Sequence, residues 1–186
     1  MAQFKSYCEA VASGNLHAVH KEYHDKEYGF PIDKDNDLFA RLVLELNQAG
    51  LSWETILKKK DGFYNAYDNF DIQIVANYGD EDRKRLMNDP SIIRNRLKIN
   101  AAIHNASVIL QLQKDCGSFK KWLQSQHPLS KEEWVKIFKK HFKFTGGEIT
   151  NEFLMSTGYL KGAHIESCKI FQKILATNPP WAQISH

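Results

Sequence analysis

Four side chains in the first third of the sequence have the chemistry to hold a flat, positively charged ligand. They are three aromatic rings and one carboxylate: Tyr23, Tyr28, Trp53 and Glu45. Apolar residues recur every three or four positions between Leu38 and Ala49, which predicts a helix over about residues 36–49 with Glu45 at the margin of its apolar face. A carboxylate in that position is costly unless a partner answers its charge. Because ring faces attract cations and a carboxylate accepts N–H donors, these residues suit a cationic ligand that donates hydrogen bonds.

A second group of residues has the chemistry of a metal site. His164 and Cys168 are spaced as i and i+4, which places them one turn apart on a common face of a predicted helix. Cys8 and His24 could supply the other half. Four nitrogen and sulfur ligands would close a tetrahedral zinc site, so the metal would be structural and would join the N- and C-terminal regions. Three cysteines are an odd and sparse set for a disulfide framework, and Cys116 is interpreted as a small core residue.

The segment 139–147 has the composition of a DNA-binding hairpin. A helix with a basic end, a tight turn containing glycine and a second helix resemble a helix-hairpin-helix, in which backbone N–H groups hold a DNA phosphate. The residues assigned to this role are Lys143, Thr145, Gly146 and Gly147. An ordinary corner between two helices is the alternative, and Glu148 would repel a phosphate unless its side chain turns outward. A second basic group, which could follow a DNA backbone or be a solvated face, consists of Arg94, Arg96 and Lys98.

Helices are the elements that must position these groups. Apolar spacing of three and four residues recurs almost throughout and strand-type alternation is nearly absent, which predicts an all-α protein. Besides the helix over 36–49, the expected helices cover about residues 53–61, 62–69, 71–76, 80–87, 99–113, 119–124, 131–140, 147–157 and 166–176. His20, three residues before Tyr23, is interpreted as a surface histidine.

Composition bounds the class of protein. At 186 residues with 42% hydrophobic side chains, the chain can form one domain, or two closely packed lobes, with a real core. The net charge is only +3, so an anionic partner would have to meet a local basic patch. No window approaches the ~18 apolar residues of a membrane span, and the N-terminus lacks the pattern of a signal peptide. We therefore expect a cytoplasmic protein with no membrane partner, and a monomer.

Several segments resemble the 3-methyladenine DNA glycosylase I family. They are Tyr23-His24-Asp25, Glu27-Tyr28-Gly29, the block from Gln48 to Lys58, the run from Ile92 to Ile99 and, more weakly, the region from Phe142 to Cys168. The resemblance covers nearly the whole chain and implies one glycosylase domain over residues 1–186. It implies an all-α helix-hairpin-helix fold and an N-glycosyl hydrolase of DNA repair, which flips 3-methyladenine out of alkylated double-stranded DNA and releases it as the free base.

The resemblance also assigns roles to individual residues. Tyr23, Glu45 and Trp53 fall where the family places base-contacting residues, and Tyr28 occupies a position where Trp is expected, with less ring area and an added hydroxyl. An N3-methylated adenine already carries positive charge and departs neutral, so Glu45, the candidate for the catalytic position, is assigned to recognition of the base. One structural zinc per chain is implied at Cys8, His24, His164 and Cys168.

Two other functions fit the same residues. One is a non-catalytic, zinc-stabilised DNA-binding module on the same scaffold. Two departures from the family make it conceivable: Tyr28 in place of Trp, and Glu148 where the family generally has Thr. Release of a base from methylated DNA separates this module from the enzyme. The other is a zinc hydrolase, which needs an open, water-bearing position on the metal.

Overall fold

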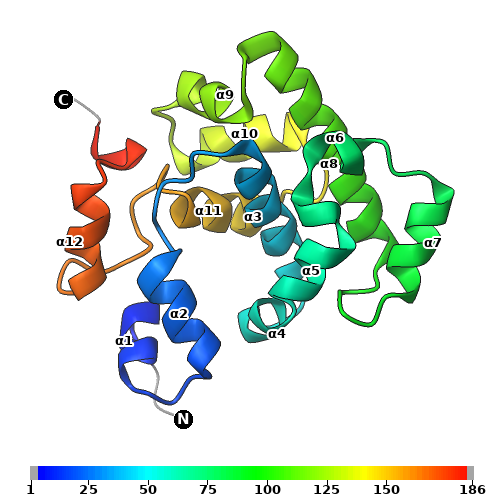
Figure 1. The fold of residues 1–186 in the computed structure, drawn as a ribbon. Helices are drawn as coiled ribbons and strands as arrows, with labels where there is room; N and C mark the ends of the chain where they lie inside the picture. Colours follow the sequence, from blue (N-terminus) through cyan, green and yellow to red (C-terminus); the bar gives the residue numbers. More distant parts are fainter. Residues whose placement is uncertain (1–3, 184–186) are drawn as a thin grey trace. The chain divides into compact units, whose positions relative to one another are not determined.

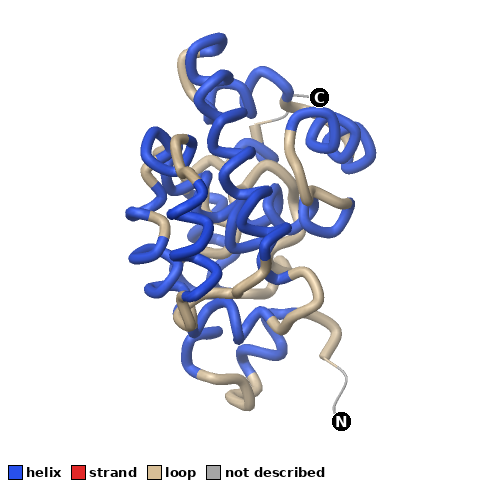
Figure 2. Tube along the Cα trace, turned by 90° about the vertical axis from the view of Figure 1, so that its right-hand side faces the viewer, coloured by secondary structure: helices blue, strands red, loops and turns tan. Residues whose placement is uncertain are grey.

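Helices and loops make up residues 4–183, which are the residues described by this computed structural model (Figure 1). No strand occurs in that range, so the all-α prediction is confirmed (Figure 2). The α-helices are α1 (Tyr7–Ala12), α2 (Ala18–Lys26), α3 (Asp35–Gln48), α4 (Trp53–Lys58), α5 (Lys60–Ala66), α6 (Ile72–Ala76), α7 (Asp80–Asn88), α8 (Arg96–Cys116), α9 (Phe119–Gln126), α10 (Lys131–His141), α11 (Gly147–Ser156) and α12 (Lys169–Ala176). Two 3-10 helices, η1 (Asp68–Phe70) and η2 (Pro180–Ala182), complete the set. No helix in the described range is long and apolar enough to cross a membrane.

Two differences from the predicted helices have local causes. The break between α4 and α5 falls at Lys59 and not at Gly62, which lies inside α5. A Cβ at Gly62 would lie 2.6 Å from the backbone oxygen of Ser91, so this glycine permits close packing and does not end a helix. The helices α1 and α2 were not predicted, although Ser6 caps α1 by accepting a hydrogen bond from the backbone of Glu9.

The residue contacts divide the chain into two compact units. One unit comprises residues 4–32 together with residues 154–183, and it holds α1, α2 and α12. The other comprises residues 33–153 and holds α3 to α10. The helix α11 runs across the division at residue 154. The first unit is therefore built from both ends of the chain, and we call it the terminal unit; the second is the central unit.

The helix α3 lies in the core of the central unit. Every residue from Leu38 to Asn47 is buried, which includes the whole circumference of the helix. Its first residue, Asp35, reaches a distant helix: its carboxylate accepts hydrogen bonds from the backbone N–H groups of Phe119 (2.8 Å) and Lys120 (3.0 Å). Asp35 thereby satisfies two of the N–H groups left open at the start of α9 and places its negative charge at the positive end of that helix.

The other end of α3 is fixed by Lys98. Its ammonium group donates hydrogen bonds of 2.7 Å each to the backbone oxygens of Asn47 and Ala49. These carbonyls have no partner within the helix, and a cation at the C-terminal end also complements the helix dipole. Lys98 is only 5% exposed, and burial lowers the pKa of its ammonium group. The cation therefore holds the end of α3 just before the turn that leads to Trp53.

This position corrects one prediction from the sequence. Lys98 does not belong to a surface basic group, whereas Arg94 and Arg96 are exposed. The reason is the phase of α8: Asn95 caps its first turn, and Lys98 then lies on the same helical face as buried Ala102 and Asn105.

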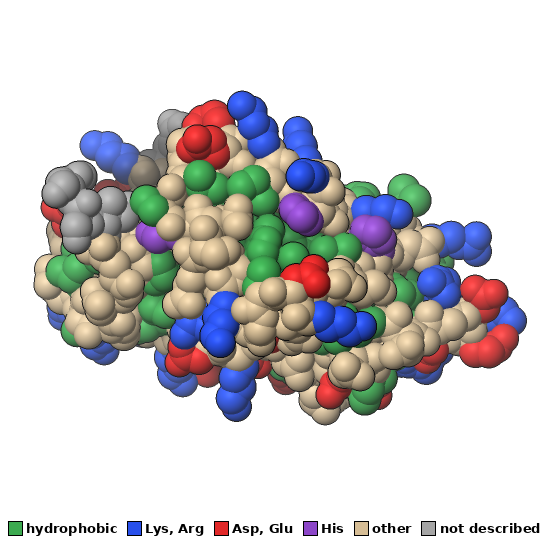
Figure 3. All heavy atoms as spheres, turned by 90° about the horizontal axis from the view of Figure 1, so that it is seen from above, with side chains coloured by type: hydrophobic (Ala, Val, Ile, Leu, Met, Phe, Trp, Pro, Cys, Tyr) green, Lys and Arg blue, Asp and Glu red, His purple; other side chains and the backbone are tan. Residues whose placement is uncertain are grey.

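On the face drawn in Figure 3, basic and acidic side chains are interspersed, as expected for a chain with a net charge of +3.

Candidate functional site

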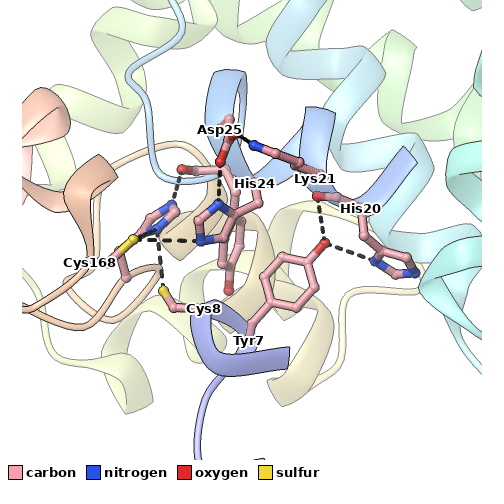
Figure 4. Close-up of polar contacts among 9 residues, drawn as sticks. Tyr7, Cys8, His20, Lys21, His24, Asp25 and Cys168 are labelled. Atoms are coloured by element: carbon pink, nitrogen blue, oxygen red, sulfur yellow. Dashed lines mark hydrogen bonds and ion pairs between the residues drawn. The ribbon is translucent and has the colours of Figure 1, made fainter. Parts of the chain in front are cut away.

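Four side chains of the types that bind metal ions converge in the terminal unit (Figure 4). They come from α1, α2 and the loop before α12: Cys8, His24, His164 and Cys168. One ligand atom from each lies within 4.8 Å of all the others. Cys8 and the two histidines are buried, at 6%, 5% and 5% exposure. The structure thus brings together the residues that the sequence analysis proposed, and this cluster could bind a metal ion.

The sequence analysis placed His164 and Cys168 on one face of a helix, but the segment that carries them is not helical. The helix α12 begins at Lys169, and the backbone N–H of Cys168 donates to the oxygen of Ile165 (2.9 Å) to close a turn. Cys168 itself has extended dihedral angles (φ −73°, ψ 133°). The turn still brings the Cys168 sulfur to 3.5 Å from Nδ1 of His164. A spacing of i and i+4 therefore predicted the pair correctly, but not the structure between them.

Each histidine of the cluster has one nitrogen directed at the centre and the other at an acceptor. Nδ1 of His24 lies 2.8 Å from a carboxylate oxygen of Asp25, and Nε2 of His164 lies 2.9 Å from the backbone oxygen of Tyr28. The pKa of Asp25 lies below its usual value, chiefly because Lys21 hydrogen-bonds to the carboxylate and to a smaller extent because His24 does so. This carboxylate therefore accepts hydrogen bonds and does not donate them. In each histidine, the nitrogen that donates to the acceptor carries the ring proton. The other ring nitrogen then has its lone pair directed at the sulfur atoms, which is the arrangement that orients histidine ligands in metal sites.

The protonation of the cluster follows from its burial. Burial raises the pKa of the Cys8 thiol to about 11 and lowers the pKa of His164 to about 4. Without metal at pH 7, the thiol of Cys8 is therefore protonated and His164 is neutral. Binding of a cation would deprotonate the thiol, because thiolate is the form that binds metal. Four protein donors leave no open position for a reactive water, which argues against a metal-bound nucleophile.

Aromatic rings surround the cluster in the terminal unit. The rings of Tyr23 and Tyr28 are buried, with centroids 5.4 Å apart. Tyr7 joins them to the cluster, because its ring makes edge contacts with Tyr28 (5.6 Å) and with His24 (5.8 Å). The sequence analysis missed Tyr7, and its position beside Cys8 was the only signal for it. His20, interpreted as a surface residue, is buried, and its Nδ1 lies 2.9 Å from the Tyr7 hydroxyl.

The glycine after Tyr28 has a structural reason. Gly29 adopts φ +85°, and a Cβ there would lie 2.8 Å from the Cβ of Ala163. Its N–H donates to the backbone oxygen of Ser156 (3.0 Å), and the N–H of Tyr28 donates to the oxygen of Tyr23 (2.9 Å). The backbone at Tyr28 and Gly29 is therefore fixed on both sides.

Glu45 and Trp53 belong to the central unit. Glu45 is 3% exposed on α3, so the expected position at the margin of the apolar face is in fact fully buried. Arg41 is also buried, one turn earlier on the same helix. Trp53 begins α4 and is partly exposed, and Ser52 caps that helix by accepting a hydrogen bond from the backbone of Thr55. A buried carboxylate and a partly open indole are thus held at the end of α3 and the start of α4.

The predicted hairpin is a tight turn between α10 and α11. Asn105 on α8 fixes it, since its amide accepts from the N–H of Lys143 (2.8 Å) and donates to the oxygen of Lys143 (3.1 Å). The Thr145 hydroxyl donates to the backbone oxygens of Phe138 and Phe142 (3.2 Å each). This hydroxyl therefore closes the turn from inside and does not face solvent.

The outer side of this turn is open. A Cβ at Gly146 or Gly147 would meet no atom of the protein within 4 Å, and neither glycine has a positive φ. Their lack of a side chain is therefore not required by the fold. The Lys143 side chain is exposed, and Glu148 points outward with 88% exposure, 3.7 Å from the ammonium group of Lys131.

The last of the candidate residues, Cys116, is not a core residue. It is the exposed final residue of α8, where Gly117 ends the helix with φ +85°. The interpretation of Cys116 as a core residue is therefore wrong, and the helix end explains why: side chains of the last turn extend past the packed part of α8.

Comparisons with known proteins agree on one family. The profile of the methyladenine glycosylase family matches residues 13–138. DNA-3-methyladenine glycosylase 1 of Escherichia coli strain K12 is 35% identical over 165 residues, which are 78% of this chain and 88% of that protein. The structure of 3-methyladenine DNA glycosylase I of Staphylococcus aureus superposes with a TM-score of 0.77 at 32% identity, covering 86% of this chain and 94% of that one. A variant 3-methyladenine DNA glycosylase I in complex with 3-methyladenine superposes equally well, with a TM-score of 0.77 at 31% identity, and 86% and 95% of the two chains covered.

Proposed function

The chain belongs to the methyladenine glycosylase family, and we propose that it is a DNA repair enzyme that hydrolyses the N-glycosidic bond of 3-methyladenine in alkylated double-stranded DNA. The predicted all-helical glycosylase fold is confirmed. The observation that carries the proposal is the match over most of the chain to 3-methyladenine glycosylases, one of them solved with the base bound. The products are free 3-methyladenine and DNA with an abasic site.

The proposed reaction depends on the charge of the damaged base. N3-methylation makes the adenine cationic, so the base leaves as a neutral molecule when the glycosidic bond breaks and needs no proton from the enzyme. Water then supplies the hydroxyl group at the sugar carbon and loses its second proton to the solvent. The enzyme must flip the nucleotide out of the helix, which costs a few kcal/mol and least for a damaged base. Selection of the base, rather than acid–base catalysis, is therefore the main task of the side chains.

We assign four side chains to this selection. Glu45 accepts hydrogen bonds from the polar edge of the purine and favours its cationic form, because a buried carboxylate interacts more strongly with a cation than an exposed one does. Tyr23, Tyr28 and Trp53 supply ring faces and edges for the flipped base. The support for these roles is the burial of Glu45 and the fixed backbone around Tyr28.

We further propose that the hairpin between α10 and α11 holds a DNA phosphate. The support is the open space outside Gly146 and Gly147, which lets a phosphate approach the backbone N–H groups, together with the exposed cation of Lys143. Thr145 contributes through its backbone and through the internal hydrogen bonds of its hydroxyl, which keep the turn rigid. The outward position of Glu148 leaves the turn itself free of negative charge.

We propose that the metal of the cluster is one structural zinc ion per chain. Tetrahedral zinc with a Zn–S distance of about 2.3 Å and a Zn–N distance of about 2.05 Å separates sulfur and nitrogen ligands by about 3.5 Å. Three of the four sulfur–nitrogen separations in the cluster are 3.4, 3.5 and 3.7 Å. Two thiolates and two imidazoles are also the donor set that selects zinc over harder cations. The ion would supply folding free energy to the terminal unit, and no step of the reaction needs it.

The working form that we propose is a monomer in the cytoplasm. The support is that its substrate is DNA inside the cell, and that one chain carries all the residues assigned above. Light scattering during size-exclusion chromatography measures the oligomeric state directly.

Chromatography of the bases released from methylated duplex DNA tests the proposed function. We expect the protein to release 3-methyladenine, and Glu45→Gln to bind the free base more weakly by about 1–3 kcal/mol, the range for a hydrogen bond to a charged group. Glu81→Gln is the matched control, because its side chain is 87% exposed on α7. A protein that binds methylated duplex but releases no base would be a DNA-binding module instead.

A further inference from the structure

The metal cluster and the proposed base-binding tyrosines share one peptide group. The backbone oxygen of Tyr28 accepts a hydrogen bond from Nε2 of His164 (2.9 Å), whose other ring nitrogen faces the sulfur atoms of Cys8 and Cys168. We propose that metal binding in the cluster controls the affinity for the alkylated base by holding Tyr28 in its binding position. This inference rests on the proposed function and extends it, because a structural ion would then set how well the base is recognised.

The tautomer of His164 is the physical link. A metal ion bound at Nδ1 requires the ring proton to be on Nε2, which is the tautomer that donates to the oxygen of Tyr28. Without metal, the neutral ring can carry its proton on Nδ1 instead and hydrogen-bond to a sulfur atom of the cluster. The lone pair of Nε2 would then face the oxygen of Tyr28, and the hydrogen bond would be lost. Metal binding therefore removes the one tautomer of His164 that cannot donate to the carbonyl oxygen of Tyr28.

The surroundings of Tyr28 transmit this change to its ring. The ring lies 5.6 Å from the ring of His164 and 5.4 Å from the ring of Tyr23, so a shift of the backbone changes both contacts. Two other hydrogen bonds hold N–H groups at this point: the N–H of Tyr28 donates to Tyr23, and the N–H of Gly29 donates to Ser156. The bond from His164 holds the carbonyl oxygen of the peptide that joins Tyr28 to Gly29.

Tyr7 provides a second connection through side chains alone. Tyr7 directly precedes the ligand Cys8 in the sequence. Its ring contacts both the ligand His24 and Tyr28, at centroid distances of 5.8 and 5.6 Å. Its hydroxyl also donates to the backbone oxygen of His20 (3.3 Å), which keeps α1 against α2 (Figure 4). When the cluster binds metal, α1 and α2 are joined through Cys8 and His24. The position of the Tyr7 ring against Tyr28 is then fixed as well.

The first test compares base binding with and without metal in the full chain. Titration calorimetry with free 3-methyladenine is performed on zinc-loaded protein, on protein stripped with a chelator, and on Cys168→Ser, which lacks one ligand but keeps His164. The matched control is Cys116→Ser, at the exposed cysteine outside the cluster. Circular dichroism confirms that each sample is folded. We expect stripped protein and Cys168→Ser to bind the base at least about fivefold more weakly, the lower end of common coupling between sites, and Cys116→Ser to bind as the parent does.

The second test uses loaded protein only, so it does not depend on the stability of the metal-free form. Coupling between two sites is reciprocal, so binding of the base must raise the affinity of the cluster for the metal. Zinc transfer to an excess of a chromogenic chelator is timed alone, with saturating 3-methyladenine, and with undamaged duplex DNA, which binds the folded protein without offering a base for Tyr28. We expect 3-methyladenine to slow the transfer and undamaged duplex to leave it unchanged.

The outcomes separate this inference from the proposed function. Equal base affinity in loaded and folded stripped protein, or zinc transfer that the base does not slow, would overturn the coupling and leave the glycosylase assignment intact. Equal slowing by base and by undamaged duplex would also overturn it, since general stabilisation of the fold would then explain the effect. Loaded protein that neither binds 3-methyladenine nor releases it from DNA would refute the proposed function and the coupling together.

Discussion

Replacement of Lys98 by methionine should destabilise the protein strongly without changing how it meets the DNA backbone. The methionine keeps most of the buried aliphatic stem but removes both hydrogen bonds to the end of α3. A buried acceptor that loses its partner costs about 1–3 kcal/mol, and the desolvation of the ammonium group is recovered in part. Water can reach the oxygen of partly exposed Ala49 more easily than that of buried Asn47. We therefore expect a loss of about 2–4 kcal/mol, or about 4–16 °C in melting temperature for a chain of this length.

The assay pairs thermal and urea unfolding with DNA binding at several salt concentrations. Lys114→Met is the control, because Lys114 is an exposed residue in the last turn of the same helix, where a substitution changes stability by no more than about 0.5 kcal/mol. A lysine that contacts phosphate contributes about one unit to the slope of log affinity against log salt concentration, and Lys98→Met should leave that slope unchanged. Stability equal to that of Lys114→Met, or a shallower salt slope, would refute the structural role of Lys98.

Three further predictions concern the other groups. Metal-stripped protein should lose up to about 3 kcal/mol of unfolding free energy as the pH falls from 6.5 to 4. Burial lowers the pKa of His164 to about 4, so the unfolded chain, with a histidine pKa near 6.5, takes up the proton first. A free energy of urea unfolding that does not vary with pH would contradict this. Gly147→Ala should keep or slightly raise the melting temperature, since its Cβ meets nothing, yet weaken binding to undamaged duplex in fluorescence anisotropy; unchanged binding would remove the phosphate from this turn. Tyr7→Leu should weaken calorimetric binding of 3-methyladenine while Tyr7→Phe, which keeps the ring contact with Tyr28, should not, and equal loss in both would assign the effect to the hydroxyl and not to the ring.

Long periodic segments made most of the fold predictable from the sequence. The helix α3 was expected within one residue at each end, and α8 is recognisable from Ile99, Ala102 and Ala106, which lie on its buried face. The helix α1 has only six residues and shows too little periodicity to be distinguished from a loop. Its position depends on Cys8 and Tyr7, whose partners lie elsewhere in the sequence.

The site was predictable where residue type alone determined the chemistry. Two cysteines and two histidines identified a cluster that could bind a metal ion, because few other roles use that combination. Residue type was misleading for Lys98 and Thr145, whose polar groups bind internal backbone oxygens and do not face a ligand. Their partners, Asn47 and Phe138, are set by how helices pack, which a local pattern does not contain. The phase of α8 did hold a signal for Lys98, since it shares a face with Ala102.

The order in which the chain is synthesised gives the terminal unit a particular history. Cys8 and His24 leave the ribosome early, but the last ligand, Cys168, lies 144 positions after His24. At about 5–20 residues per second, the first two ligands wait roughly 7–29 s for the others. During that time a nascent chain offers only half of a metal site, which holds an ion far more weakly than four ligands do.

A chain that stops short of Cys168 therefore never completes the cluster, whatever the state of the residues in between. Retention of the proposed ion would then distinguish chains that include Cys168 from chains that stop before it. The same holds after synthesis: a protease that removes the segment from His164 onward also removes two of the four candidate ligands and would release the ion. Metal content per chain would consequently measure how much of a preparation still has both Cys8 and Cys168.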